Sequence, residues 1–263
     1  MTELLRVEHI NKSYISGNAF GGVKTQVLKD ISFAFNKGES YGLLGASGCG
    51  KSTLARLILA LERPDSGKIY IEGQDIFSLN SKELKQLRKK VQPVFQDPYA
   101  SLNPRMTIEE VLAEPFLIHG QKPQLSALKK LLCQVGLAEN SLAKYPHEFS
   151  GGQRQRIAIA RALALKPQLI IADEPLSSLD VSVQAQILNL FADIKKEYGL
   201  SLVFISHDFA LCKFLCDRAA VMDKGIIAEE GPSEKVILHP QSQAAQMLLK
   251  AVLPLGGQGG GNV

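Results

Sequence analysis

The sequence lacks any long apolar run. No stretch of the 263 residues approaches the roughly 18 consecutive apolar residues that a membrane-spanning helix needs. The opening residues, "MTELLRVEHINKSY", also lack the apolar segment of a secretory signal. We therefore expect a protein without a membrane anchor of its own, so that any function at a membrane would require spanning helices from another chain.

The sequence also has few cysteines and only a small net charge. The four cysteines, at positions 49, 133, 212 and 216, show no zinc-ligand spacing. Without a secretory signal, we expect their thiols to stay reduced in the cytoplasm. The net charge is only +4, and no basic run is present. Charge alone therefore does not indicate nucleic acid as a partner.

The sequence does contain short apolar runs that alternate with helical patterns. Residues 40–44, 169–173 and 202–206 are apolar runs of strand length, whereas 51–61 and 181–198 carry apolar residues at helical spacing. This alternation predicts an α/β fold, with a mainly parallel sheet flanked by helices on both faces. On the first helix, we expect one apolar face formed by Leu54, Leu57, Ile58 and Leu61.

Other regions depart from this alternation. The first thirty-odd residues and 66–73 resemble short strands with polar turns, which makes an antiparallel N-terminal sheet plausible. Residues 97–165 show helical patterns and no convincing strand, so we expect a helical insert there. The core would then comprise 1–96 and 166–255, and we expect the glycine-rich 256–263 to form a disordered tail.

Residues 91–96 form a further apolar run, but it contains Pro93. Proline cannot donate a hydrogen bond to a neighbouring strand. We therefore expect this strand to lie at a sheet edge or to contain a bulge.

A phosphate-binding loop is predicted at 45–52, where "GASGCGKS" fits G-x-x-x-x-G-K-[ST] between a predicted strand and a predicted helix. Backbone N–H groups can surround an anion there, Lys51 can reach the β- and γ-phosphates, and the Ser52 hydroxyl can bind Mg²⁺. A glycine-rich surface turn is the weaker alternative, because both flanking elements are present. We also expect the helix start to acidify the thiol of Cys49.

Polar side chains follow other apolar runs, at the edge where strands of an α/β sheet present their carboxyl ends. Asp173 ends one run and Glu174 follows it, while Gln96 and His207 each follow another. We expect Asp173 to hold Mg²⁺ through water and Glu174 to polarise a water against the γ-phosphate. Gln96 would sense Mg²⁺ or water, and His207 would contact the γ-phosphate. For each residue alone, a solvated loop is the alternative.

A second glycine-rich helix start, without a lysine, lies at residues 150–153, "SGGQ". Ser150 is a favourable N-cap, but two glycines just inside a helix cost about 1 kcal/mol each relative to alanine. We infer that the close approach of a phosphate offsets this cost. Because residues 45–52 already surround the chain's own nucleotide, the phosphate would belong to a second, head-to-tail subunit. An ordinary capped helix is the alternative.

Together these motifs resemble the ATP-binding subunit of ABC transporters over essentially the whole chain. The family motifs are matched as Walker A at 45–52, Q-loop at Gln96, signature at 149–153, Walker B and catalytic glutamate at 169–174, D-loop at 177–180 and switch histidine at His207. The resemblance implies one ATPase domain over 1–255, with a P-loop NTPase core, an antiparallel β subdomain and a helical insert. It implies ATP and Mg²⁺ as cofactors.

The resemblance also implies roles for individual residues. Glu174, His207 and Gln96 would be catalytic, and Ser52, Gln96 and Asp173 would bind the metal. An aromatic residue would stack on adenine, either Tyr14 or its rival Phe20. The remaining nucleotide contacts would be Gly45, Ala46, Ser47, Gly48, Cys49, Gly50, Lys51, Ser52, Thr53, Ser150, Gly151, Gly152, Gln153 and Asp180.

Two longer segments, 94–105 and 145–163, resemble the nickel, dipeptide and oligopeptide import branch of the family. "KAVLPL" at 250–255, with no cysteine-rich extension after it, favours nickel or a metal–metallophore complex as cargo. The alternatives are a di- or oligopeptide importer, an exporter or regulatory subunit, and a soluble ATPase that does not serve transport.

The implied partners are a second ATPase subunit, related or identical, two membrane permeases and an extracytoplasmic binding protein. The implied location is peripheral, on the cytoplasmic face of the inner membrane.

Overall fold

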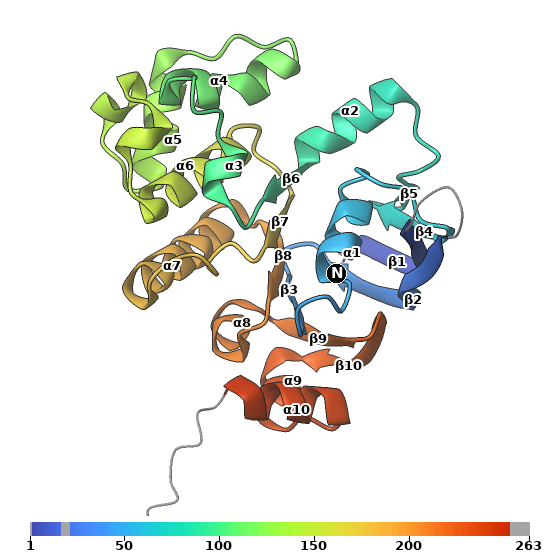
Figure 1. Cartoon of the computed structure of the whole chain (residues 1–263). Helices are drawn as coiled ribbons and strands as arrows, with labels where there is room; N and C mark the ends of the chain where they lie inside the picture. The colour runs from blue at the N-terminus through green and yellow to red at the C-terminus, as the bar shows by residue number, and fades with distance from the viewer. Residues whose placement is uncertain (1, 17–21, 253–263) are drawn as a thin grey trace, which may run out of the picture.

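The computed structural model describes residues 2–16 and 22–252, which form two sheets with flanking helices (Figure 1). Phe20 and the expected tail at 256–263 lie outside the described residues. The strands are β1 (Glu3–Ser16), β2 (Val23–Asn36), β3 (Ser40–Gly45), β4 (Ser66–Ile71), β5 (Gln74–Asp75), β6 (Val91–Val94), β7 (Leu169–Asp173), β8 (Ser201–Ser206), β9 (Arg218–Asp223) and β10 (Ile226–Pro232).

The helices occupy most of the intervening sequence. They are α1 (Lys51–Ile58), α2 (Ser81–Lys90), α3 (Pro98–Ser101), α4 (Ile108–Ile118), α5 (Leu125–Gln134), the 3-10 helices η1 (Glu139–Ala143) and η2 (Pro146–Glu148), α6 (Gly151–Leu163), α7 (Val181–Tyr198), α8 (Phe209–Leu215), α9 (Ser233–Leu238) and α10 (Gln243–Val252).

The central sheet has the strand order β10-β9-β3-β8-β7-β6, and only the β9–β10 pair in it is antiparallel. Alternate residues of one strand face opposite sides, so Phe204 of β8 belongs to one hydrophobic core and Val203 to the other. Both faces of β8 are therefore buried, which explains its uninterrupted apolar sequence. The predicted α/β fold is confirmed.

The N-terminal sheet has the order β2-β1-β4-β5, with every pair antiparallel, as expected. Its apolar side chains, including Leu5, Phe35 and Ile69, share a core with α1 and with one face of the central sheet. This sheet lies on the opposite side of the central sheet from α7 (Figure 1).

Between β6 and β7 the described chain is helical, from α3 through α6, and these helices form one end of the molecule (Figure 1). Capping boxes define the starts of two of them, with Thr107 and Glu110 at α4 and Ser150 and Gln153 at α6. Their apolar residues share a core with α7 and the other face of the central sheet. The helical region is thus packed onto the sheet that carries the candidate site.

Two local expectations have different outcomes. Pro93 does lie on an edge strand, since β6 ends the order of the central sheet and pairs with β7. The helix expected over 51–61, however, ends at Ile58, because Ala60 has a left-handed φ of 51°. Leu61 is 53% exposed, so its predicted place on the buried face is wrong.

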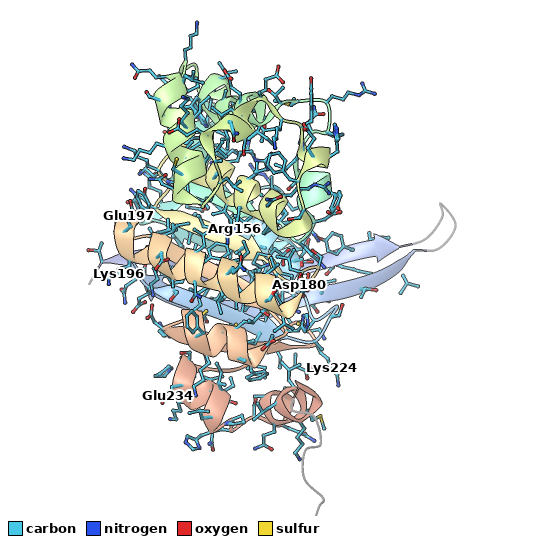
Figure 2. All side chains as sticks on the ribbon, turned by 90° about the vertical axis from the view of Figure 1, so that its left-hand side faces the viewer. Arg156, Asp180, Lys196, Glu197, Lys224 and Glu234 are labelled. Carbon is cyan, nitrogen blue, oxygen red and sulfur yellow. The ribbon has the colours of Figure 1, made fainter. Side chains whose placement is uncertain are left out.

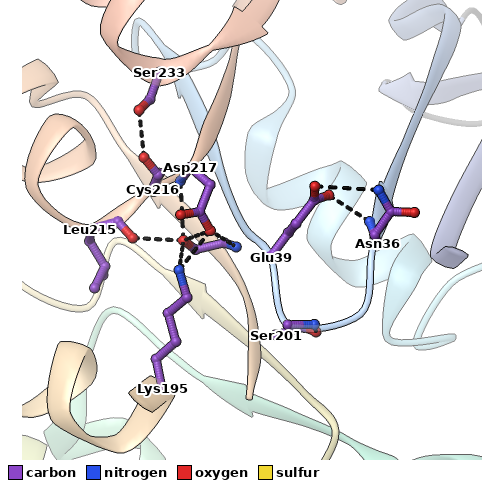
Figure 3. Close-up of polar contacts among 10 residues, drawn as sticks. Asn36, Glu39, Lys195, Ser201, Leu215, Cys216, Asp217 and Ser233 are labelled. Carbon is purple, nitrogen blue, oxygen red and sulfur yellow. Dashed lines mark hydrogen bonds and ion pairs between the residues drawn. The ribbon is translucent and has the colours of Figure 1, made fainter. Parts of the chain in front are cut away.

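A polar network ties the amino end of β3 to α7 and β9 (Figure 3). The Lys195 Nζ donates to Ser40 Oγ at 2.7 Å and to Asp217 Oδ2 at 2.6 Å, and the Ser40 N–H donates to Asp217 Oδ2 at 2.8 Å. Burial alone would raise the pKa of Asp217, but the hydrogen bonds from Lys195 and Ser40 lower it below its ordinary value.

We predict that Asp217→Asn destabilises the protein by about 1 kcal/mol at pH 7, because it removes charge-assisted hydrogen bonds from a half-exposed carboxylate. The folded-state pKa lies below the unfolded one, so this stabilisation is present at neutral pH and fades as the pH falls through the folded-state pKa. Urea unfolding at pH 7 and at acid pH measures it.

The control is Asp193→Asn, because Asp193 is exposed and makes no polar contact with the described residues. Equal urea midpoints for the two variants at pH 7 would contradict the role given to the network.

Candidate functional site

The loop between β3 and α1 folds as a strand–turn–helix around Lys51. Gly50 caps the helix with a left-handed φ of 111°, and a Cβ there would lie 2.7 Å from Leu28 Cδ2, so only glycine fits. The Lys51 Nζ donates to Gly45 O at 2.8 Å and to Ala46 O at 3.0 Å. A pocket opens beside this loop, and the predicted site residues that line it are Ser47, Gly48, Gly50, Lys51, Ser52, Thr53, Gln96 and Glu174.

Glu174, directly after β7, lines the same pocket, and Asp173 at the end of β7 contacts a residue of the pocket wall. The Ser52 Oγ lies 3.1 Å from Asp173 Oδ1, so the two predicted metal ligands are neighbours. Burial, together with the charge of Glu174, raises the pKa of Asp173. Ser52 and Asp173 provide oxygen atoms of the type that Mg²⁺ prefers, and Gln96, which lines the same pocket, carries a further amide oxygen.

Glu174 is held between two other predicted site residues. Its carboxylate lies 3.8 Å from Lys51 Nζ through Oε1 and 3.5 Å from His207 Nδ1 through Oε2. Its backbone has a left-handed φ of 45°, and its N–H donates to Ile205 O at 3.0 Å. Such a conformation is unfavourable for a non-glycine residue and is frequent at functional sites.

The thiol of Cys49 does not have the lowered pKa that we expected from its place at the helix start. Its thiol is buried behind the loop, and it does not line the pocket. Burial raises the pKa of Cys49, and this effect outweighs the lowering by the nearby Lys51. The predicted acidified thiol is therefore wrong: the helix start is present, but the removal of water from around the sulfur decides the direction of the shift.

The second glycine-rich stretch opens onto a different pocket. There, Ser150 Oγ accepts from Gln153 N, and Gln153 Oε1 accepts from Ser150 N at 3.0 Å, which forms a capping box. This second pocket is lined by Ser150, Gly151 and Gly152 together with Gln96, Tyr99 and Asp180. The first three of these residues do not line the phosphate-loop pocket. Gln96 belongs to both pockets.

Gly152 has a packing role that the sequence did not reveal. A Cβ at this position would lie 2.3 Å from Val183 Cγ1, because α6 approaches the first turn of α7 closely. At Gly151 the corresponding contact, with Leu179, is an ordinary 3.5 Å. The glycine at 152 is thus explained by helix packing without any phosphate, whereas no such constraint explains the glycine at 151.

The D-loop is fixed by α7, whose two ends are marked by Asp180 and Lys196 in Figure 2. The Asp180 carboxylate caps the helix by accepting from Val183 N at 3.0 Å. Sequence reasoning missed Gln184, whose Nε2 donates to Leu176 O and to Leu179 O, both at 3.0 Å, and so holds the loop at two points. A polar residue on an amphipathic helix gives no signal that it reaches back to a loop.

Tyr14 lies on β1, and its hydroxyl donates to Glu62. The Lys12 ammonium lies 5.2 Å from the centre of the Tyr14 ring. Tyr14 does not line the phosphate-loop pocket. Its stacking on adenine stays a prediction, and its rival Phe20 falls outside the described residues.

Comparison with known proteins identifies the family. A model described as "ABC transporter" matches residues 28–177. The chain belongs to the ABC transporter family. It is an ATP-binding and ATP-hydrolysing subunit, as its motifs predicted.

Curated relatives and solved structures agree with this assignment. The oligopeptide transport ATP-binding protein OppF of Bacillus subtilis (strain 168) is 44% identical over 258 residues, covering 96% of this chain and 83% of OppF. OppF of Streptococcus mutans serotype c is 44% identical over 254 residues, covering 95% and 82%. The dimeric ATP-binding cassette MJ0796 bound to ADP and Pi has a TM-score of 0.77 at 29% identity, covering 88% of this chain and 99% of that chain.

These relatives bear on the cargo expected from the sequence. Both curated relatives are named as oligopeptide transport proteins. They support the peptide alternative better than the nickel interpretation, which relied on a few residues near the carboxyl end.

We predict that Gly152→Ala in this ABC ATPase costs about 1–3 kcal/mol of stability, because the new methyl group overlaps Val183. Adding Val183→Ala should restore most of the loss, and thermal unfolding measures both. Gly151→Ala is the matched control and should not lower the melting temperature. An unchanged melting temperature for Gly152→Ala would refute the packing role.

We also predict that iodoacetamide modifies Cys49 at least about tenfold more slowly than the exposed Cys133 at pH 7, because Cys49 is buried and its pKa is raised. Mass spectrometry of the folded protein over time gives both rates. Equal rates would show that the thiol is accessible and acidic after all.

Proposed function

We propose that this ABC ATPase powers a di- or oligopeptide importer, as a peripheral subunit on the cytoplasmic face of the membrane. The identity to the two OppF proteins, over nearly the whole chain, supports the peptide cargo. Among the described residues, no helix is long and apolar enough to cross a membrane. The transport path would therefore be formed by two permease subunits, and an extracytoplasmic binding protein would deliver the peptide to them.

The residues of the phosphate loop would bind the triphosphate of ATP. Loop N–H groups between Gly45 and Thr53 would surround the β- and γ-phosphates, and Lys51 would exchange its carbonyl partners for phosphate oxygens. Ser52, Asp173 and Gln96 would hold Mg²⁺, since their oxygens fit this ion. When bound, the ion would neutralise charge on the phosphates.

Glu174 is the proposed general base for ATP hydrolysis. Its carboxylate lies between Lys51 Nζ and His207 Nδ1, and this juxtaposition is the observation on which the proposal rests. From this place Glu174 would orient a water and accept its proton as the water attacks the γ-phosphorus. His207, which is more than half exposed, would contact the γ-phosphate.

The second pocket supports a site shared between two ATPase subunits. Ser150, Gly151, Gly152 and Gln153 present a helix start without a lysine, away from the phosphate loop of their own chain. We infer that they cap the γ-phosphate of ATP bound by a second subunit, whose D-loop Asp180 would lie at the shared boundary. The dimeric form of MJ0796 supports this arrangement.

The permeases would dock in the groove between the insert, residues 97–165, and the rest of the ATPase domain. This groove is lined by Lys85 and Arg88 of α2 and by Ile118 of α4, while Arg161 of α6 is paired there with Glu114 at 3.8 Å. Leu117 and Ile118 are exposed beside it. A cytoplasmic permease helix that carries acidic and apolar side chains would match these groups.

We predict that Glu174→Gln lowers kcat about 10²- to 10⁴-fold, because the amide cannot accept the proton from water, while ATP binding is kept. The variant should accumulate as an ATP-bound dimer, measured by light scattering. Lys51→Ala, the comparison variant, should stay monomeric because it loses ATP affinity. Hydrolysis by Glu174→Gln at the native rate would remove Glu174 from this role.

The cargo is tested on the complex of this chain with its permeases in lipid vesicles. A peptide-loaded binding protein should increase the ATPase rate, and the same binding protein with a Ni²⁺ chelate should not. Stimulation by the nickel-loaded form alone would restore the nickel interpretation.

A further inference from the structure

The short helix α3 begins two residues after Gln96 and packs against α6 (Figure 1). Tyr99 lies on α3, and the Arg154 guanidinium carbon is 3.7 Å from the centre of the Tyr99 ring. Two helical turns along α6, Arg161 Nη1 donates to Ser101 O at 2.7 Å. The segment after Gln96 is therefore attached to α6 at two points on one helix face.

Arg154 is an unusual residue to find buried so deeply in a helix near the surface. It is 6% exposed, its Nε donates to Pro146 O at 2.6 Å and its Nη2 donates to His147 O at 3.2 Å. Its Nη1 has no hydrogen-bond acceptor among the described residues. Because the guanidinium lies over the Tyr99 ring, the electron-rich face of the ring offsets part of the cost of burying this cation.

Tyr99 is 64% exposed, so it contributes little apolar burial to the fold. The ring also lines the pocket that Ser150, Gly151 and Gly152 form. Tyr99 and the helix start at Ser150 thus line one pocket, and the helix that carries Tyr99 begins two residues after Gln96. A side chain that is important only for stability would not need this position.

We propose that Tyr99 and Arg154 form a strut that transmits the position of Gln96 to the α6 start, so that ATP in the phosphate-loop pocket sets the orientation of Ser150 toward the second subunit. Tyr99 and Arg154 are positioning residues, which act through Gln96 and Ser150. This inference rests on the proposed function, in which Gln96 contacts the ATP-bound metal or water and Ser150 caps ATP of the partner subunit.

The test compares ATP-driven dimerisation in a Glu174→Gln background, with and without Tyr99→Leu. Loss of one cation–π contact should raise the ATP concentration needed for half-maximal dimerisation about tenfold. ATP affinity of the monomer, measured by calorimetry at low protein concentration, should stay within about twofold. Hydrogen exchange should show that ATP-dependent protection of amides 150–156 is lost in Tyr99→Leu.

Two control variants accompany the test. Tyr99→Phe keeps the aromatic ring and should dimerise like the Glu174→Gln parent. Tyr70→Leu removes another arginine–tyrosine contact, in which the Arg6 guanidinium lies 4.4 Å from the Tyr70 ring centre in the N-terminal sheet. It should also dimerise like the parent, because it is remote from α3 and α6.

Each outcome decides between the two proposals. If Tyr99→Leu dimerises at the parent's ATP concentration, or if its monomer loses ATP affinity in parallel, the strut is overturned and the proposed function stands. If the Glu174→Gln parent itself remains monomeric with ATP, the proposed ATP site between two subunits is wrong, and the proposed role of Tyr99 and Arg154 is wrong as well.

Discussion

The parallel pairing of β3, β7 and β8 is the constraint on which the site depends. Leu44 of β3 pairs with Ser206 of β8, and Asp173 of β7 pairs with Ile205 of the same strand. The residues after these strands therefore emerge at one edge of the sheet, although the end of β3 lies more than a hundred positions before the ends of β7 and β8 in the sequence. Hydrophobic burial on both faces holds these strands in the interior of the sheet.

Much of this site could be predicted because its signals are local. A strand, a glycine-rich turn and a helix start define the phosphate loop within a dozen residues, and polar residues that directly follow apolar runs identify the sheet edge. The missing N–H of Pro93 likewise predicted an edge strand or a bulge, and the strand lies at the sheet edge. The antiparallel N-terminal sheet followed from short strands with polar turns, which is also a local pattern.

The failures share a tertiary cause. Leu61 had the correct helical spacing, but the left-handed Ala60 ends the helix before it. Cys49 sits at a helix start that would acidify an exposed thiol, yet burial raises its pKa instead. Gln184 and Tyr99 contact residues of other segments, and no periodic pattern in the sequence predicts these contacts. The nickel cargo was predicted from residues near the carboxyl end, whereas the curated relatives support the peptide alternative better.

The close packing at Gly152 has a consequence for how the molecule can be recombined. Because α6 meets Val183 with no space for a methyl group, the signature helix and the first turn of α7 are matched surfaces encoded on both sides of β7. A chimaera that exchanges only 97–165 with a relative would separate these matched surfaces. The unit that can be transplanted as a whole runs past the apparent end of the insert, through the D-loop and into α7.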